Sequence, residues 1–133
     1  MKTLDPDILA TLIASRNQAY APYSGFMVSA LVESVDGRHF AGTNVETAHY
    51  KSICAEASAI SAMVCAGRRR IAAVYILAGN RPTPPCGDCR QRILEFAEPD
   101  TRIVLIDPDG RIAKSYSIDE LLPDAFGPNN LAG

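Results

Sequence analysis

Residues 54–56 read Cys-Ala-Glu, and residues 85–89 read Pro-Cys-Gly-Asp-Cys. Each stretch stands where a helical apolar pattern begins after a loop, and an apolar, strand-like run lies between them. The free N–H groups and positive dipole of a helix N-terminus lower the pKa of a nearby thiol. We therefore expect Cys54, Cys86 and Cys89 to meet as thiolates where two helices begin.

Three cysteines in this arrangement favour a catalytic zinc site. A zinc ion with three protein ligands keeps its fourth position open for water, whereas a structural site is closed. Glu56 lies in the same expected helical turn as Cys54, where a carboxylate can exchange protons with that water without binding the metal. Structural zinc and dithiol redox chemistry are the alternatives that a Cys-x-x-Cys pair leaves open. Iron or another soft-ligand metal would also suit three thiolates.

The fourth cysteine, Cys65, is expected to lie outside the site. It falls about three turns after Cys54 on the same expected helix, roughly 16 Å away by helix rise, so one ion cannot bind both. We predict that Cys65 is a small buried core residue.

Apolar periodicity and turn residues predict an α/β fold. Asp-Gly pairs at 36–37 and 109–110 indicate tight turns between strands. This order of elements favours a mixed sheet of about five strands with helices on its faces. The expected helices cover 5–20, 52–66, 87–97 and 117–122, and the expected strands cover 26–34, 38–45, 71–78, 102–106 and 111–114.

Length and composition limit the classes of function. The 133 residues predict one domain, 1–133, and a net charge of −2 gives no reason to expect a nucleic-acid polymer as partner. The basic run at 68–70 is expected to lie at a helix C-terminus. Neither a membrane span nor a signal peptide is apparent, so we expect a cytoplasmic protein in which Cys-x-x-Cys binds metal rather than forming a structural disulfide.

With these motifs in place, the sequence resembles the cytidine deaminases, in particular their short-chain homotetrameric branch with a three-cysteine zinc site. The resemblance implies a cytidine-deaminase-like three-layer sandwich, one Zn²⁺ per subunit, a homotetramer and a small nucleoside substrate. It runs through Tyr20-Ala-Pro-Tyr-Ser24 with Phe26, Asn44-Val-Glu46, Cys54-Ala-Glu56, Pro85-Cys-Gly-Asp-Cys-Arg-Gln91, Glu95-Phe96 and Leu121-Leu-Pro-Asp-Ala-Phe126.

The resemblance also implies roles for residues that spacing alone does not single out. Phe26 would lie against the pyrimidine ring, and Asn44 and Glu46 would bind the ribose hydroxyls. Backbone groups around Ala55 and the Cys86 loop would contact the edge of the base. Phe126 would close the pocket of a neighbouring subunit.

Each of these roles has a plainer alternative. By periodicity alone Phe26 is a core strand residue, Asn44 a turn former and Glu46 a solvated charge. Tyr50 is assigned to the pocket, although ordinary packing explains it equally well. We interpret His49 as a residue of the pocket rim or of the shell around the ligands.

The sequence departs from the family pattern at several positions. The usual Asn-Ala-Ser-Tyr is here Thr47-Ala-His49-Tyr50, close to where the sugar would lie. The family often places Arg directly after the catalytic Glu, where this chain has Ala57. We expect Arg90 to take over the task of balancing the thiolate charge, since groups around metal ligands tune the ion.

The implied function is hydrolysis of cytidine or deoxycytidine to uridine or deoxyuridine and ammonia, as in pyrimidine salvage. One alternative is the same chemistry on a modified cytosine nucleoside or a nucleoside-like antibiotic such as blasticidin S. Another is a zinc-binding assembly module without catalysis, against which Glu56 argues. Editing of a polynucleotide is the weakest reading, because no basic groove is apparent.

Overall fold

The computed structural model describes residues 3–132, and its centre is one mixed sheet with strands in the order β2-β1-β3-β4-β5. Strands β3 and β4 are parallel, and every other neighbouring pair is antiparallel. The strands are β1 (Val28–Ser34), β2 (His39–Thr43), β3 (Ile71–Ala78), β4 (Ala97–Ile106) and β5 (Ile112–Ser117). The predicted mixed sheet is therefore confirmed.

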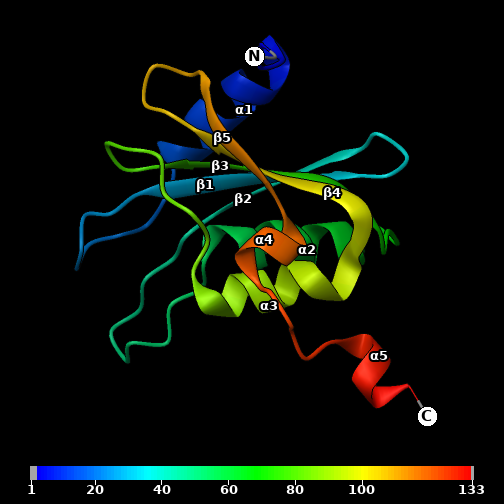
Figure 1. The fold of residues 1–133 in the computed structure, drawn as a ribbon. Helices are drawn as coiled ribbons and strands as arrows, with labels where there is room; N and C mark the ends of the chain where they lie inside the picture. Colours follow the sequence, from blue (N-terminus) through cyan, green and yellow to red (C-terminus); the bar gives the residue numbers. More distant parts are fainter. Residues whose placement is uncertain (1–2, 133) are drawn as a thin grey trace.

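Helices cover both faces of the sheet (Figure 1). Helix α1 (Pro6–Arg16) lies on one face, and α2 (Ala55–Cys65), α3 (Gly87–Phe96) and the short α4 (Ile118–Leu121) lie on the other. A last turn, α5 (Pro128–Leu131), projects away from these layers near the C-terminus. This is the expected three-layer sandwich. Within residues 3–132, each helix is too short or too polar to cross a bilayer.

Apolar side chains of the central strands alternate between the two faces of the sheet, so the core is divided into two clusters. Ala30 and Val32 of β1 are fully buried in the cluster beneath α2 and α3, whereas Leu31 packs in the second cluster with Leu12 of α1. Successive side chains of a strand point to opposite faces, so a strand buried on both faces needs an unbroken apolar run. Strand β3, which reads Ile-Ala-Ala-Val-Tyr-Ile-Leu-Ala, has that run.

Two helix boundaries differ from the prediction. The first helix ends at Arg16 rather than near Tyr20, because the Tyr20 backbone N–H donates to Asn44 O and its carbonyl accepts from Glu46 N–H. The second helix, expected from residue 52, begins at Ala55 with Cys54 as its N-cap. In both places, pairing with a distant segment replaces local helical bonds.

The later part of the chain contains further differences. Strand β4 begins at Ala97, directly after α3, because Ala97 already pairs with Ile71 of β3. Helix α5 was not expected from the sequence. Cys65 at the end of α2 is exposed, so its prediction as a core residue is wrong: it lies on the solvent side of the last helical turn.

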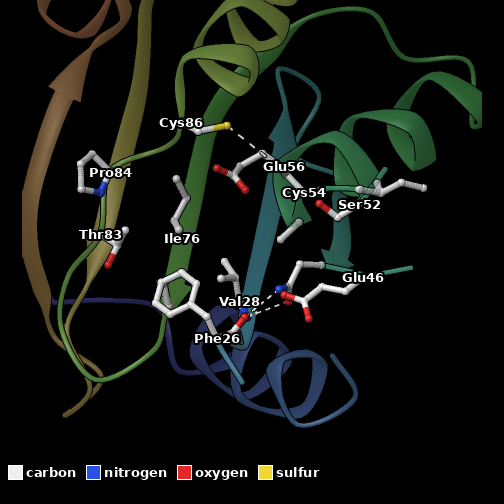
Figure 2. A pocket seen from close by; sticks show the side chains of 14 residues that line it. Phe26, Val28, Glu46, Ser52, Cys54, Glu56, Ile76, Thr83, Pro84 and Cys86 are labelled. Carbon is white, nitrogen blue, oxygen red and sulfur yellow. Dashed lines mark hydrogen bonds between the residues drawn. The ribbon is translucent and has the colours of Figure 1, made fainter. Parts of the chain in front are cut away.

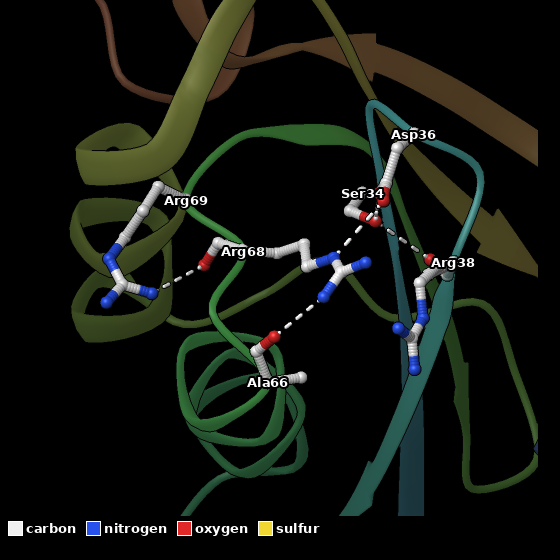
Figure 3. Close-up of polar contacts among 6 residues, drawn as sticks. All are labelled: Ser34, Asp36, Arg38, Ala66, Arg68 and Arg69. Atoms are coloured by element: carbon white, nitrogen blue, oxygen red, sulfur yellow. Dashed lines mark hydrogen bonds and ion pairs between the residues drawn. The ribbon is translucent and has the colours of Figure 1, made fainter.

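The basic run after α2 caps that helix, as predicted. Figure 3 shows Arg68 Nη1 donating to Ala66 O at 2.8 Å, with its Nε paired to Asp36 of the β1–β2 turn at 3.1 Å. Arg69 Nη1 donates to Val64 O at 3.0 Å. Cationic groups at a helix C-terminus satisfy free carbonyls and oppose the helix dipole. Gly67, with φ of +84°, makes the turn that allows this contact.

Gly42 of β2 fixes the position of α2. A Cβ at this position would lie 2.5 Å from Ala59 N and 2.7 Å from Ala55 O, both backbone atoms of the helix. Because backbone atoms cannot rotate aside, Gly42→Ala is expected to lower the free energy of unfolding by about 1–3 kcal/mol in urea titrations of the zinc-free protein.

Gly87→Ala is the matched control, since a Cβ there meets nothing within 4 Å. Its free energy of unfolding should equal or slightly exceed that of the parent, because alanine favours a helix over glycine. Equal stability of the two variants would contradict the close contact between β2 and α2.

Candidate functional site

The register of the sheet brings three separate segments to one end of it. Val28, at the start of β1, pairs with Ala78 at the end of β3, while the neighbouring Ser29 pairs with Thr43 at the end of β2. The segments that enter β1 and leave β2 and β3 therefore meet. Helices α2 and α3 begin after the latter two strands, and ligands bind at such strand ends in α/β sheets.

A two-residue ladder holds the first metal-ligand candidate in place. Val45 and Ile53 exchange backbone hydrogen bonds of 3.0 and 2.9 Å, which closes the loop 46–52. Cys54 follows directly as the N-cap of α2, and Cys86 is the N-cap of α3. The two helix N-termini are thereby directed at one point, as the sequence predicts.

The three predicted cysteines form a group suited to zinc. Their sulfur atoms all lie within 4.8 Å of one another, and the Sγ atoms of Cys54 and Cys86 are 3.9 Å apart. Tetrahedral bonding at the usual Zn–S length places two sulfurs about 3.8 Å apart. The Cys54–Cys86 distance matches this value, so the donor set suits zinc, and Cys65 takes no part in it.

The thiols are harder to ionise than the sequence suggested. Burial, followed by repulsion from the Cys86 thiolate, raises the pKa of Cys54. Burial also raises the pKa of Cys89, and the negative charges of Glu56 and the other two cysteines add to the effect. The predicted lowering is therefore wrong for these two thiols, whose pKa values burial and mutual repulsion raise. A bound cation is needed to stabilise the thiolates, which couples metal binding to proton release.

Glu56 is the buried acid of the site. It lies in the first turn of α2, only 5% exposed, and burial raises its pKa. Figure 2 shows its carboxylate directed into the cavity beside Cys86 and Ile76. A carboxyl group with a raised pKa is a stronger base than an ordinary carboxylate and can return the proton it accepts, as general acid–base chemistry requires.

A cavity of about 210 Å³ opens in front of this group. Its wall contains most of the predicted residues, namely Phe26, Asn44, Glu46, Cys54, Ala55, Glu56 and Cys86. Sequence reasoning missed the remaining wall residues, which are Val28, Ser52, Ile53, Ile76, Ala78, Thr83 and Pro84. The proline-rich loop before Cys86 was a signal for Thr83 and Pro84, whereas the strand residues look like ordinary core in the sequence.

Three of the residues predicted to line or rim the pocket lie outside the cavity wall of their own chain. Tyr50 is 86% exposed, so neither pocket lining nor core packing describes it in the single chain. Phe126 is 60% exposed, and Gln91 Nε2 donates to its carbonyl at 2.7 Å. His49 is also exposed and does not reach the cavity wall.

Asn44 and Glu46 hold the segment that carries Phe26. Asn44 donates from Nδ2 to Phe26 O at 2.7 Å and accepts at Oδ1 from Val28 N–H at 2.9 Å. Glu46 accepts from the Ser24 hydroxyl and backbone N–H, and these bonds lower the pKa of its carboxyl. Both side chains therefore shape the wall as well as facing the cavity.

Arg90 does not take the position that we expected. Its Nε donates to Pro85 O and its Nη1 to Leu121 O, both at 2.8 Å, so it ties the cysteine loop to α4 rather than donating to sulfur. Arg92, which sequence reasoning passed over, lies with Nη1 3.8 Å from Cys89 Sγ. One helical turn separates Arg92 from Cys89, and residues three apart share a helix face.

Comparison with known proteins shows which family has this arrangement. Residues 3–106 match the family described as the cytidine and deoxycytidylate deaminase zinc-binding region. The chain belongs to this deaminase family. It is accordingly a hydrolytic deaminase with a zinc cofactor, and its group of Cys54, Cys86 and Cys89 is able to hold the ion.

Relatives of this deaminase match over most of its length. A cytidine deaminase of Mycoplasma genitalium is 40% identical over 112 residues, 82% of this chain and 85% of that protein. One from Halalkalibacterium halodurans is 39% identical over 121 residues, with coverage of 90% and 91%. The crystal structure of a cytidine deaminase from Burkholderia pseudomallei superposes with a TM-score of 0.83 at 38% identity, covering 92% of this chain and 99% of that one.

Zinc content tests the ligand assignment of the deaminase. Cys86→Ser removes a thiolate of the group, and we expect bound zinc, measured by atomic absorption after dialysis, to fall from about one per chain to a small fraction, since a hydroxyl is a poor zinc ligand.

Cys65→Ser is the matched control, because this exposed thiol lies outside the group and its loss should leave zinc content unchanged. A Cys86→Ser protein with full zinc content would contradict the assignment.

Proposed function

We propose that the chain converts cytidine and deoxycytidine to uridine and deoxyuridine, releasing ammonia in pyrimidine salvage. The observation that carries this proposal is the buried carboxyl of Glu56, directed into a cavity whose wall also contains Cys54 and Cys86 (Figure 2). The relatives named above are cytidine deaminases and cover most of the chain. We therefore take the substrate in their names, cytidine, as the substrate of this cavity.

The chemistry divides between the cofactor and the chain. Zinc, when bound by the three cysteines, supplies Lewis-acid activation of water. Glu56 would pass one proton from the attacking water to N3 of the base, and a second proton from the new C4 hydroxyl to the amino group, which leaves as ammonia when the C4–N bond breaks and the carbonyl forms. Burial suits this cycle, because it keeps the pKa of Glu56 above the ordinary carboxyl value and excludes competing water.

The substrate contacts follow the wall of the cavity. Phe26 lies against the pyrimidine ring, and backbone groups at Ala55 and in the Cys86 loop bind the edge of the base. Asn44 and Glu46 bind the ribose hydroxyls with the hydrogen-bonding capacity that their backbone contacts leave free. Tyr50 would reach a pocket only across a subunit boundary.

A modified cytosine nucleoside or an antibiotic of the blasticidin S type is the second candidate substrate. It rests on the departures at Thr47 and His49, but neither residue lines the cavity of its own chain. The buried Thr47 hydroxyl has no hydrogen-bond partner among residues 3–132, so it is available to a neighbouring subunit, a ligand or a bound water. A non-catalytic zinc module is disfavoured, because it has no use for a buried acid facing the cavity.

Ammonia release from cytidine and deoxycytidine tests the reaction. Glu56→Gln should keep its zinc and lose about 10²- to 10⁴-fold in kcat, the usual contribution of a positioned acid–base group. Glu98→Gln is the control, since its exposed pair with Arg70 lies on the strand β4 surface and should not affect turnover.

Two results would count against the proposal. Equal turnover by Glu56→Gln and the parent would remove the proton-transfer role. A zinc-loaded parent that releases ammonia from the antibiotic but not from either nucleoside would establish the second candidate in its place.

We further propose that the enzyme is a cytoplasmic homotetramer in which Phe126 completes the pocket of a neighbouring subunit. Support comes from the family resemblance and from the exposed apolar side chains of Tyr50, Ile53 and Phe126. Exposed aromatic residues near a site are typical of surfaces that bind another chain.

Mixing two impaired variants tests the sharing of Phe126. Phe126→Ala keeps Glu56, whereas Glu56→Gln keeps Phe126, so hybrids formed by subunit exchange should recover part of the activity with cytidine. The mass of each species by light scattering gives the number of subunits. Mixing Phe126→Ala with a Glu56→Gln/Phe126→Ala double variant is the control. Recovery in the control, or none in the test mixture, would contradict a role across the interface.

A further inference from the structure

The zinc site has a charge that its own ligands do not balance. Three thiolates around one divalent cation carry a net negative charge, and an ionised Glu56 adds to it. Cys89 is fully buried and Glu56 nearly so, and burying unpaired charge is costly. The N-termini of α2 and α3 supply partial positive charges at Cys54 and Cys86. Cys89 lies inside α3, three positions beyond its N-cap, where the contribution of the dipole is smaller.

Arg92 is the cation placed to balance this charge at Cys89. Its Nη1 lies 3.8 Å from Cys89 Sγ, within hydrogen-bond range for sulfur. In the part of the chain that the structure describes, no other lysine or arginine donates to one of the three sulfurs. The nearby Arg90 guanidinium is directed instead at two backbone carbonyls.

The surroundings of Arg92 explain how its side chain reaches the sulfur. Arg92 and Ala57 line the same surface hollow between α3 and α2, together with Ile60 and Ser61. The small side chain of Ala57 leaves this hollow open. Arg92 is exposed in the single chain, so its guanidinium keeps water on one side while donating to sulfur on the other, which limits the cost of desolvation.

We propose that Arg92 is a positioning residue of the zinc site, which stabilises the metal-bound Cys89 thiolate by its positive charge. Arg92 does not line the substrate cavity and acts only through the ligand. Its effect should therefore appear in zinc affinity before any substrate is added. The inference rests on the metal centre alone, so it stands or falls independently of cytidine as the substrate.

Competition with a chromophoric chelator measures the zinc affinity of each variant. Arg92→Met removes both charge and donor and should weaken zinc binding about 10- to 100-fold, the usual effect of losing a partner of a metal ligand. Arg92→Lys keeps the charge and should stay within a few-fold of the parent. Arg111→Met is the matched control: this exposed turn residue lies next to Gly110, which contacts Leu9 of α1 on the opposite face of the sheet.

A relocation variant keeps the test valid if Arg92→Met also disturbs α3. Ala57→Arg combined with Arg92→Met returns a guanidinium to the same hollow from the other helix, and zinc affinity should recover toward that of the parent. Thermal unfolding of each zinc-free variant reports whether the fold is intact.

Two outcomes would overturn the proposal. Equal zinc affinity of Arg92→Met and Arg111→Met would mean that the helix N-termini and solvent balance the thiolate charge without Arg92. An Arg92→Lys protein as weak as Arg92→Met, with no recovery in the relocation variant, would mean that packing and not charge is what Arg92 contributes.

Discussion

The close approach of three cysteine sulfurs, all within 4.8 Å of one another, is the interaction on which the rest of the structure depends. Two of them are N-caps of different helices and the third lies one turn into α3, so both helices must begin at the same point. Bringing them together requires the end of β2, the end of β3 and the start of β1 to lie side by side. The order of the strands, the closing of the loop 46–52 and the close contact at Gly42 all serve that requirement.

Much of this architecture is predictable from the sequence, because it rests on local chemistry. Local sequence determines the two Asp-Gly turns, the end of α2 at its glycine and the strands formed by apolar runs. The spacing of Cys54, Cys86 and Cys89 likewise indicates a metal site. The helix boundaries that were predicted wrongly depend on hydrogen bonds to residues distant in the sequence. Tyr20 and Ile53 leave their expected helices because they pair with the Asn44–Glu46 segment, which no local pattern reveals.

The arginines near the zinc site show a second limit of prediction from the sequence. Arg90 follows Cys89 directly, which made it the obvious donor in the sequence, yet consecutive residues on a helix point in different directions. Arg92, three positions on, shares the face of Cys89. The pKa values of the thiols also could not be predicted from local sequence. They are raised by burial and mutual repulsion, which arise only when the three cysteines meet, whereas the prediction considered each thiol at its own helix N-terminus.

The backbone ladder between Val45 and Ile53 has an evolutionary consequence. It separates the loop 46–52 from the start of α2, so changes at the tip of this loop are not transmitted to Cys54 and Glu56. Loops anchored at their base accept substitutions and insertions more readily than the elements they join. The exposed residues at the tip of this loop, where another chain could meet the enzyme, can therefore diversify while the metal ligands and the proton-carrying acid stay in place.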